Sequence, residues 1–100
     1  MRYGIKDDYW IILCELFSKK TKIEKVILYG SRAKGNFKPF SDIDITLVGD
    51  KLEHNDLLDI TDGIEELLFP YMFDVSLYSS LKNEKLIEHI DRVGVVIYPL

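Results

Sequence analysis

The chain has 100 residues, the length of one domain, and its 47% hydrophobic and 30% charged content is typical of a globular protein rather than a disordered one. With 17 acidic against 13 basic residues the formal charge is −4, which excludes a broad basic surface, so we expect no direct nucleic-acid binding. No apolar run approaches the roughly 18 residues of a membrane span, and the N-terminus lacks the apolar core of a signal peptide. The single cysteine excludes an intrachain disulfide. We therefore expect one cytoplasmic domain over residues 1–100.

The first half of the chain predicts a helix, a strand, a short helix and a second strand. Hydrophobic side chains recur at helical spacing over residues 7–20. Residues 26–29 are apolar on both faces, which is typical of a central strand covered by helices. Ser31 is a suitable N-cap and Gly35 a suitable end for the short helix. Residues 42–48 alternate between apolar and polar side chains, as a strand with one buried face does.

The second half continues this alternation of helices and strands. Residues 55–69 and 83–93 each carry an apolar stripe at helical spacing, and Gly94 is a suitable left-handed residue after the second helix. Residues 72–78 alternate like a half-buried strand, and residues 95–98 form a last apolar run. The predicted fold is therefore α/β (α+β), with a mixed sheet of about four strands and helices packed against it.

Two carboxylates share one face of the second predicted strand. Asp42 and Asp44 are two positions apart, which places their Cα atoms roughly 6.6–7 Å apart on the same side. Neighbouring carboxylates repel, and a divalent cation between them removes the repulsion; oxygen ligands favour Mg²⁺ or Mn²⁺. Asp74 is the only acidic residue within the third predicted strand and joins the pair if the two strands are neighbours in register. An Asp-x-Asp triplet alone is also typical of a solvated strand face.

A glycine-containing turn precedes the carboxylates. Gly30 and Ser31 directly follow the apolar strand, and a strand that feeds a turn and a helix start presents free N–H groups to an anion. The Ser31 hydroxyl, the Arg32 fork and the Lys34 ammonium can add further phosphate contacts. The spacing is neither that of a Walker A motif nor that of a dinucleotide-binding turn. Taken alone, the same residues also suit an ordinary polar loop.

The combination of turn and carboxylates resembles a known family. The string LYGSRAKG at 28–35, followed after five residues by SDIDI at 41–45, resembles the nucleotidyltransferase superfamily related to DNA polymerase β, whose signature is a Gly-Ser turn before Asp-x-Asp. The C-terminal pattern at 90–98 looks like the ending of the minimal nucleotidyltransferase (MNT) proteins. The resemblance implies a polymerase β-like nucleotidyltransferase fold over most of the chain.

The resemblance also implies a reaction and its residues. Asp42 and Asp44 would bind one or two Mg²⁺ ions, for which Mn²⁺ could substitute. Asp74 would also bind metal and would help to activate the attacking hydroxyl. A nucleoside monophosphate, AMP from ATP, would pass to an acceptor with release of pyrophosphate. The positions that match the family's nucleotide-binding segment are Gly30 and Ser31, for the β- and γ-phosphates, and Arg32 and Lys34, which are often basic in the family.

Minimal members of the family resemble the antitoxin halves of toxin–antitoxin pairs. Their partner is a HEPN-domain protein, and the resemblance implies transfer of AMP to a tyrosine of that toxin. It also implies that the two proteins could form a hetero-oligomer. Larger relatives carry an extra domain for the base or the acceptor, for which this chain has no room. Two other hypotheses stay open: an antitoxin that masks its partner by binding alone, and a small-molecule nucleotidyltransferase of the aminoglycoside-modifying type.

Overall fold

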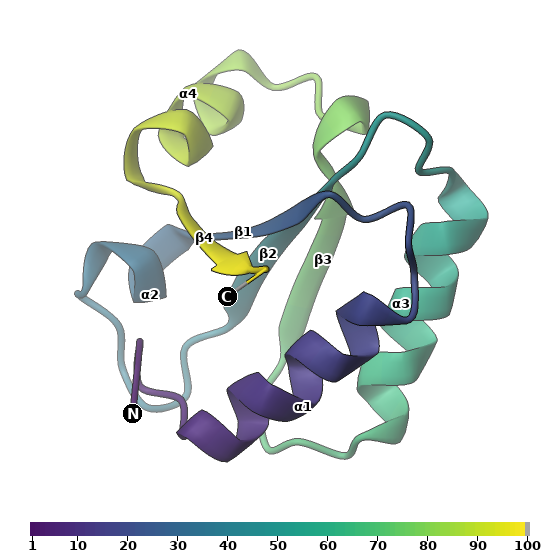
Figure 1. Ribbon diagram of the computed structural model, residues 1–100. Coiled ribbons are helices and arrows are strands. Elements are labelled where there is room, and N and C mark those ends of the chain that lie inside the picture. Colours follow the sequence, from purple (N-terminus) through teal and green to yellow (C-terminus); the bar gives the residue numbers. More distant parts are fainter. Residues whose placement is uncertain (100) are drawn as a thin grey trace.

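A four-stranded mixed sheet forms the centre of the protein, which we describe from a computed structural model over residues 1–99 (Figure 1). The strands are β1 (Lys25–Tyr29), β2 (Ile43–Val48), β3 (Phe73–Leu77) and β4 (Val95–Tyr98), in the spatial order β3-β2-β1-β4. Strand β1 pairs antiparallel with β2 and with β4, whereas β2 and β3 run parallel. The predicted mixed α+β sheet is confirmed.

The helices lie on both faces of this sheet. Helix α1 (Asp7–Ser18) packs beside α3 (His54–Glu66) on one face, and the short α2 (Gly30–Lys34) packs beside α4 (Glu84–Val93) on the other. A single 3-10 turn, η1 (Tyr78–Ser80), follows β3. Because the α2–α4 layer contacts mainly β1, it leaves the outer part of its face, over β3, uncovered. Within residues 1–99 no helix is both long and apolar enough to cross a membrane.

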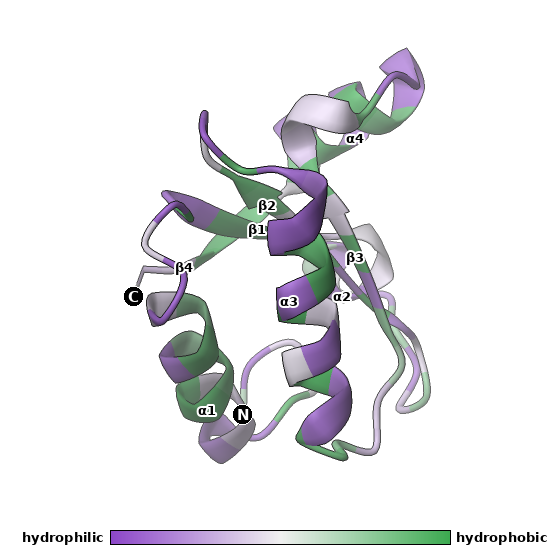
Figure 2. Cartoon of the chain, turned by 90° about the vertical axis from the view of Figure 1, so that its right-hand side faces the viewer, coloured by the Kyte–Doolittle hydropathy of each residue, from purple (hydrophilic) through white to green (hydrophobic). Residues whose placement is uncertain are grey.

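The core lies between the sheet and the α1–α3 layer. Ile43, Ile45 and Leu47 are buried on one side of β2, as the alternation predicts. The apolar stripes of the two helices cover them, and Figure 2 shows both helices striped with hydrophobic and hydrophilic residues. The buried apolar residues of these two helices are Trp10, Leu13 and Phe17 on α1 and Ile60 and Ile64 on α3. With this side of β2 committed to the core, the polar side chains of β2 must lie on the opposite face.

Two local predictions are wrong. Ser31 does not cap α2, because the helix begins one residue earlier, at Gly30, and its cap position is Tyr29. Gly94 is extended, with φ −61° and ψ 144°, rather than left-handed. Glycine is required there for space: a Cβ would overlap the carbonyl oxygen of Ile90 and lie 2.6 Å from Cγ2 of Ile27. The other elements begin and end within a few residues of their predicted bounds.

Candidate active site

Two of the predicted carboxylates are brought together by strand pairing. Asp44 on β2 is the direct register partner of Asp74 on β3. Paired Cα atoms on neighbouring strands are about 5 Å apart, and both side chains leave the sheet on the face opposite the core. Asp42 is exposed just before β2 begins. Asp44 and Asp74 are therefore neighbours at one end of the β2–β3 pair, and Asp42 lies close enough for its charge to act on Asp44.

The cluster carries an electrostatic cost. Burial raises the pKa of the Asp44 carboxyl above its usual value of 3.8, the negative charges of Asp74 and Asp42 raise this pKa further, and the nearby His89 side chain opposes the shift. Ionised Asp44 is thus less stable in the folded chain than in water. A bound cation would remove this penalty, whereas within the fold alone the arrangement only costs stability.

The donor set fits a hard divalent cation that is shared with a substrate. All three side chains offer carboxylate oxygens, the ligands of Mg²⁺ and Mn²⁺ rather than of structural zinc. Within residues 1–99, however, no three His, Cys, Asp or Glu side chains are gathered closely enough to enclose an ion. Mg²⁺ commonly takes one or two carboxylates and completes its shell with phosphate and water. Asp44 and Asp74, with Asp42 at their edge, suit such an open site.

The turn between β1 and α2 packs directly against these carboxylates. Gly30 has φ +76°, a left-handed conformation, and a Cβ there would overlap Oδ2 of Asp44. The backbone N–H of Gly30 donates to Nε2 of His89 over 3.1 Å. Ser31, the next residue, is half-buried in the first turn of α2. Gly30 therefore lies against Asp44, with Ser31 next to it in the chain, and the Gly30 amide already has a partner.

Arg32 departs from its prediction as a nucleotide contact. Its side chain is only 1% exposed. Nε and Nη2 both donate to the Ser41 carbonyl, at 3.0 and 2.8 Å, Nη2 also donates to Pro39 at 3.2 Å, and Nη1 donates to Tyr3 at 2.8 Å. These carbonyls belong to the N-terminal segment and to the loop before Asp42. A guanidinium committed in this way holds the loop and is not free to receive a phosphate.

Two aromatic rings complete the enclosure of Arg32. The guanidinium carbon lies 5.2 Å from the centre of the Phe37 ring and 5.3 Å from that of Tyr71. Lys34, the second predicted cation, is exposed at the end of α2 and makes no hydrogen bond or ion pair with the other described residues. Of the two cations, Lys34 alone stays accessible to a ligand.

Sequence analysis missed two aromatic side chains of the site. Tyr29 is the register partner of Asp44 and is 7% exposed. The pKa of its hydroxyl is raised, first by burial and then by the nearby charges of Asp74 and Asp44, although a hydrogen bond with the Ser76 side chain lowers it in part. The ring of His89, on α4, stands edge-on to Tyr29 with centroids 6.2 Å apart. Tyr29 directly precedes the glycine turn and pairs with Asp44 across the β1–β2 ladder. This pairing is visible only once the register of the two strands is known. His89 lies 59 residues from Gly30 and carries no local signal.

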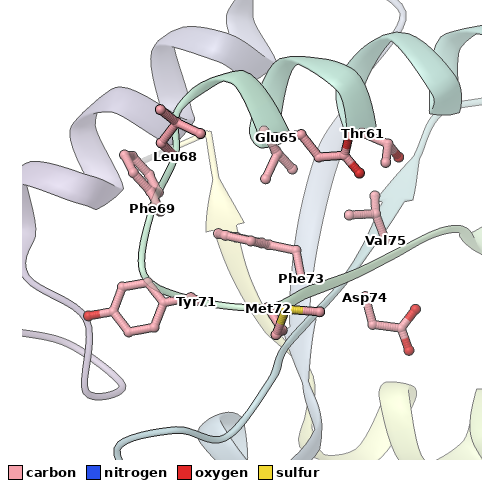
Figure 3. A pocket seen from close by; sticks show the side chains of 10 residues that line it. Thr61, Glu65, Leu68, Phe69, Tyr71, Met72, Phe73, Asp74 and Val75 are labelled. Carbon is pink, nitrogen blue, oxygen red and sulfur yellow. The ribbon is translucent and has the colours of Figure 1, made fainter.

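A groove of about 480 Å³ lies on the other side of β3. Its lining includes Phe73 and Val75, which turn toward α3, whereas the Asp74 carboxylate turns away from it (Figure 3). Leu68 and Met72, also in the lining, are 88% and 72% exposed. The groove thus lies at the edge of the sheet, and Thr61, Glu65 and Asp74 line it together with apolar residues.

The model of the family described as "Polymerase beta, Nucleotidyltransferase" matches residues 13–99. The chain therefore belongs to the polymerase β nucleotidyltransferase family. A comparison with curated protein sequences gives no match.

Solved structures share the fold at low sequence identity. A toxin–antitoxin structure with AMP-PNP has a TM-score of 0.71 and 20% identity, covering 93% of this chain and 73% of that one. A mutant of the toxin–antitoxin MntA-HpeT has a TM-score of 0.70 and 18% identity over 94% and 73%. The tri-AMPylated Shewanella oneidensis HEPN toxin in complex with MNT antitoxin has a TM-score of 0.65 and 16% identity over 89% and 68%. At this level of identity the likeness shows a shared fold.

Replacing Asp44 by asparagine should stabilise the fold near neutral pH. A raised folded-state pKa means that ionisation of Asp44 destabilises the folded chain, so wild type loses stability relative to Asp44→Asn as pH rises through that pKa. We expect the variant to melt about 1–4 °C higher near pH 7 and equally near pH 3, where the carboxyl is protonated in both states. Thermal unfolding at both pH values checks this. The exposed Asp50→Asn is the matched control and should show no difference.

Two glycine substitutions separate backbone strain from the contact with Asp44. Gly30 and Gly35 are both left-handed, with φ +76° and +89°, so alanine costs each about 1–2 kcal/mol. A Cβ at Gly35 meets no atom within 4 Å, whereas one at Gly30 overlaps Asp44. In urea unfolding we expect Gly30→Ala to lose about 1–3 kcal/mol more than Gly35→Ala. Equal losses would show that the close approach to the carboxylate has no energetic weight.

Arg32 should behave as a structural residue. Arg32→Met keeps the length of the side chain but leaves the carbonyls of Tyr3, Pro39 and Ser41 without the buried guanidinium that donates to them. We expect a loss of about 2–4 kcal/mol in the free energy of unfolding. Lys34→Met, two residues along the same helix, should change it by less than about 0.5 kcal/mol because that side chain is exposed. Similar values for the two variants would contradict the structural role.

Proposed function

We propose that this chain is a Mg²⁺-dependent nucleotidyltransferase that transfers AMP from ATP to a tyrosine hydroxyl of a HEPN-domain toxin and thereby acts as its antitoxin. The observation that carries the proposal is the contact between Gly30 and Asp44, which sets a turn of the kind that binds phosphate against the Asp44–Asp74 pair. The AMP-PNP in one structural neighbour and the AMPylated HEPN toxin in another support the nucleotide and the acceptor.

Each site residue has a role in this proposal. The Ser31 hydroxyl and the free N–H groups of the first turn of α2 would bind the β- and γ-phosphates, beside Gly30. Lys34 would add charge from the end of that helix. Asp42 and Asp44 would hold the cation with Asp74, and a bound divalent ion supplies charge neutralisation for the phosphate oxygens. Arg32 would act indirectly by fixing the loop that carries Asp42.

The reaction would be an in-line displacement at the α-phosphorus. The acceptor oxygen forms a bond to phosphorus while the bond from phosphorus to the oxygen that bridges the α- and β-phosphates breaks, releasing pyrophosphate. The hydroxyl proton would leave toward a carboxylate, and we assign this role to Asp74 because its side chain is exposed.

The acceptor would come from a partner protein. Strand β3 is at the edge of the sheet, and the α2–α4 layer contacts mainly β1, so the face around Asp74 is open to a second molecule. The described residues offer no separate acceptor-binding domain around it. A toxin that presents a tyrosine to this edge, as part of a hetero-oligomer with this chain, would complete the site.

A second candidate function is neutralisation by binding alone. The groove behind β3 favours it, because Leu68 and Met72 are large, apolar and highly exposed at its rim. Such a surface suits a protein partner. Under this alternative the antitoxin effect needs the surface and not the carboxylates.

Label transfer distinguishes these functions. The chain is incubated with Mg²⁺, the HEPN-domain product of the neighbouring gene and ATP labelled at the α-phosphate, with γ-labelled ATP as the control for phosphate transfer. We expect label on the partner from α-labelled ATP alone. Asp42→Asn, Asp44→Asn and Asp74→Asn should each lower the rate by about 100-fold or more, whereas Asp50→Asn should not.

The remaining outcomes identify the alternatives. Neutralisation of the toxin that survives all three asparagine variants would establish masking as the function. Transfer to a small acceptor without a protein partner would favour a small-molecule nucleotidyltransferase. No transfer of label from any nucleoside triphosphate would overturn the enzymatic proposal.

A further inference from the structure

His89 joins the last helix to the candidate phosphate turn. It is half-buried on α4, and its Nε2 accepts the backbone N–H of Gly30 over 3.1 Å. Its ring also packs edge-on against Tyr29, with centroids 6.2 Å apart. Tyr29 and Gly30 are the two residues on either side of the peptide bond that leads from β1 into α2. One side chain from a distant helix therefore contacts both residues of this bond.

The hydrogen bond fixes the chemical form of His89. A backbone N–H can only donate, so Nε2 must carry a lone pair, and the imidazole proton must be on Nδ1. The same bond uses the Gly30 amide. A phosphate at this turn would therefore have to take its hydrogen bonds from Ser31 onward, and the Gly30 N–H would serve to hold the turn.

The turn needs such an external acceptor. Gly30 is left-handed and lies against Asp44. Tyr29 is the last residue of β1 that pairs with β2, so Gly30 lies just beyond the paired part of the strand. Helix α2 has only five residues and no side-chain cap for its start. Its first amide would otherwise lack a protein partner, and the peptide plane before it would be free to rotate.

We infer that His89 is a positioning residue, which orients the peptide between Tyr29 and Gly30 so that the turn is preorganised for a nucleoside triphosphate. The inference rests on the proposed function. His89 touches no reacting atom in this role; it acts through the Gly30 amide. This role requires a hydrogen-bond acceptor at the position of Nε2. Any side chain that places an acceptor at that position should therefore substitute for His89.

Two matched variants test the acceptor. His89→Gln can place its Oε1 near the position of Nε2, whereas His89→Phe keeps a ring against Tyr29 but has no acceptor. Binding of AMP-PNP with Mg²⁺ is measured by calorimetry for the whole chain. We expect the Phe variant to bind about tenfold more weakly, the equivalent of one hydrogen bond, and the Gln variant to stay within about threefold of wild type.

The outcomes separate this inference from the proposed function. Equal affinity of wild type and the Phe variant, or equal weakening in both variants, would overturn the role of His89 alone. Absence of nucleotide binding by wild type would instead count against the proposed function, and the inference would fall with it. Thermal unfolding of both variants provides the control. If His89 only stabilised the fold, both variants would be less stable than wild type, and the Gln variant would not bind AMP-PNP better than the Phe variant.

A measurement without any substitution tests the geometry directly. Nitrogen chemical shifts of His89 in the unliganded protein, above the pH at which histidine is protonated, report which ring nitrogen carries the proton. We expect the proton on Nδ1 and a bare Nε2, with slow exchange of the Gly30 amide. The opposite tautomer would overturn the inference whatever the nucleotide affinities.

Discussion

A carboxylate oxygen of Asp44 occupies the space beside Gly30 where a side chain would begin. This contact sets the relative positions of β1 and β2 at the end where Tyr29 pairs with Asp44, and the β2–β3 register then places Asp74 beside the same carboxylate. Because Gly30 starts α2, the direction of the short helix depends on the same contact. The glycine turn and the carboxylates are thus held within one packing arrangement, and the core residues lie on the other side of β2.

The site is built to be completed by other molecules. The carboxylates repel one another in the isolated chain, the described residues form no closed metal cage, and the face around Asp74 is uncovered. Under the proposed function, a nucleotide would bring phosphate oxygens for a shared cation, and a partner protein would cover the open edge. A net charge of −4 is compatible with the proposed anionic substrate, because backbone N–H groups and a cation would receive the phosphates without a basic surface.

Much of the fold follows from local patterns in the sequence. Alternation over 42–48 predicts both the strand and its buried face, and the apolar run at 26–29 predicts a central strand. The carboxylate pair follows from a spacing of two. What local patterns cannot supply is the identity of tertiary partners: Arg32 and Lys34 are equivalent in sequence, yet one is enclosed by carbonyls from two distant segments and the other is exposed. His89 reaches Gly30 only after α4 has packed on β1, so its contact depends on the completed fold.

The enclosure of Arg32 gives the N-terminal segment a part in the site. The family model begins at residue 13, but Tyr3 supplies one of the carbonyls that hold the guanidinium, and Gly4 is packed so closely that a Cβ would lie 2.8 Å from Nη1. A bridge between Arg2 and Ile5 shapes this segment, and the Ile5 side chain is fully buried. The functional unit is therefore longer than the family match. A domain boundary drawn at the start of that match would remove one wall around the buried arginine and loosen the loop that presents Asp42.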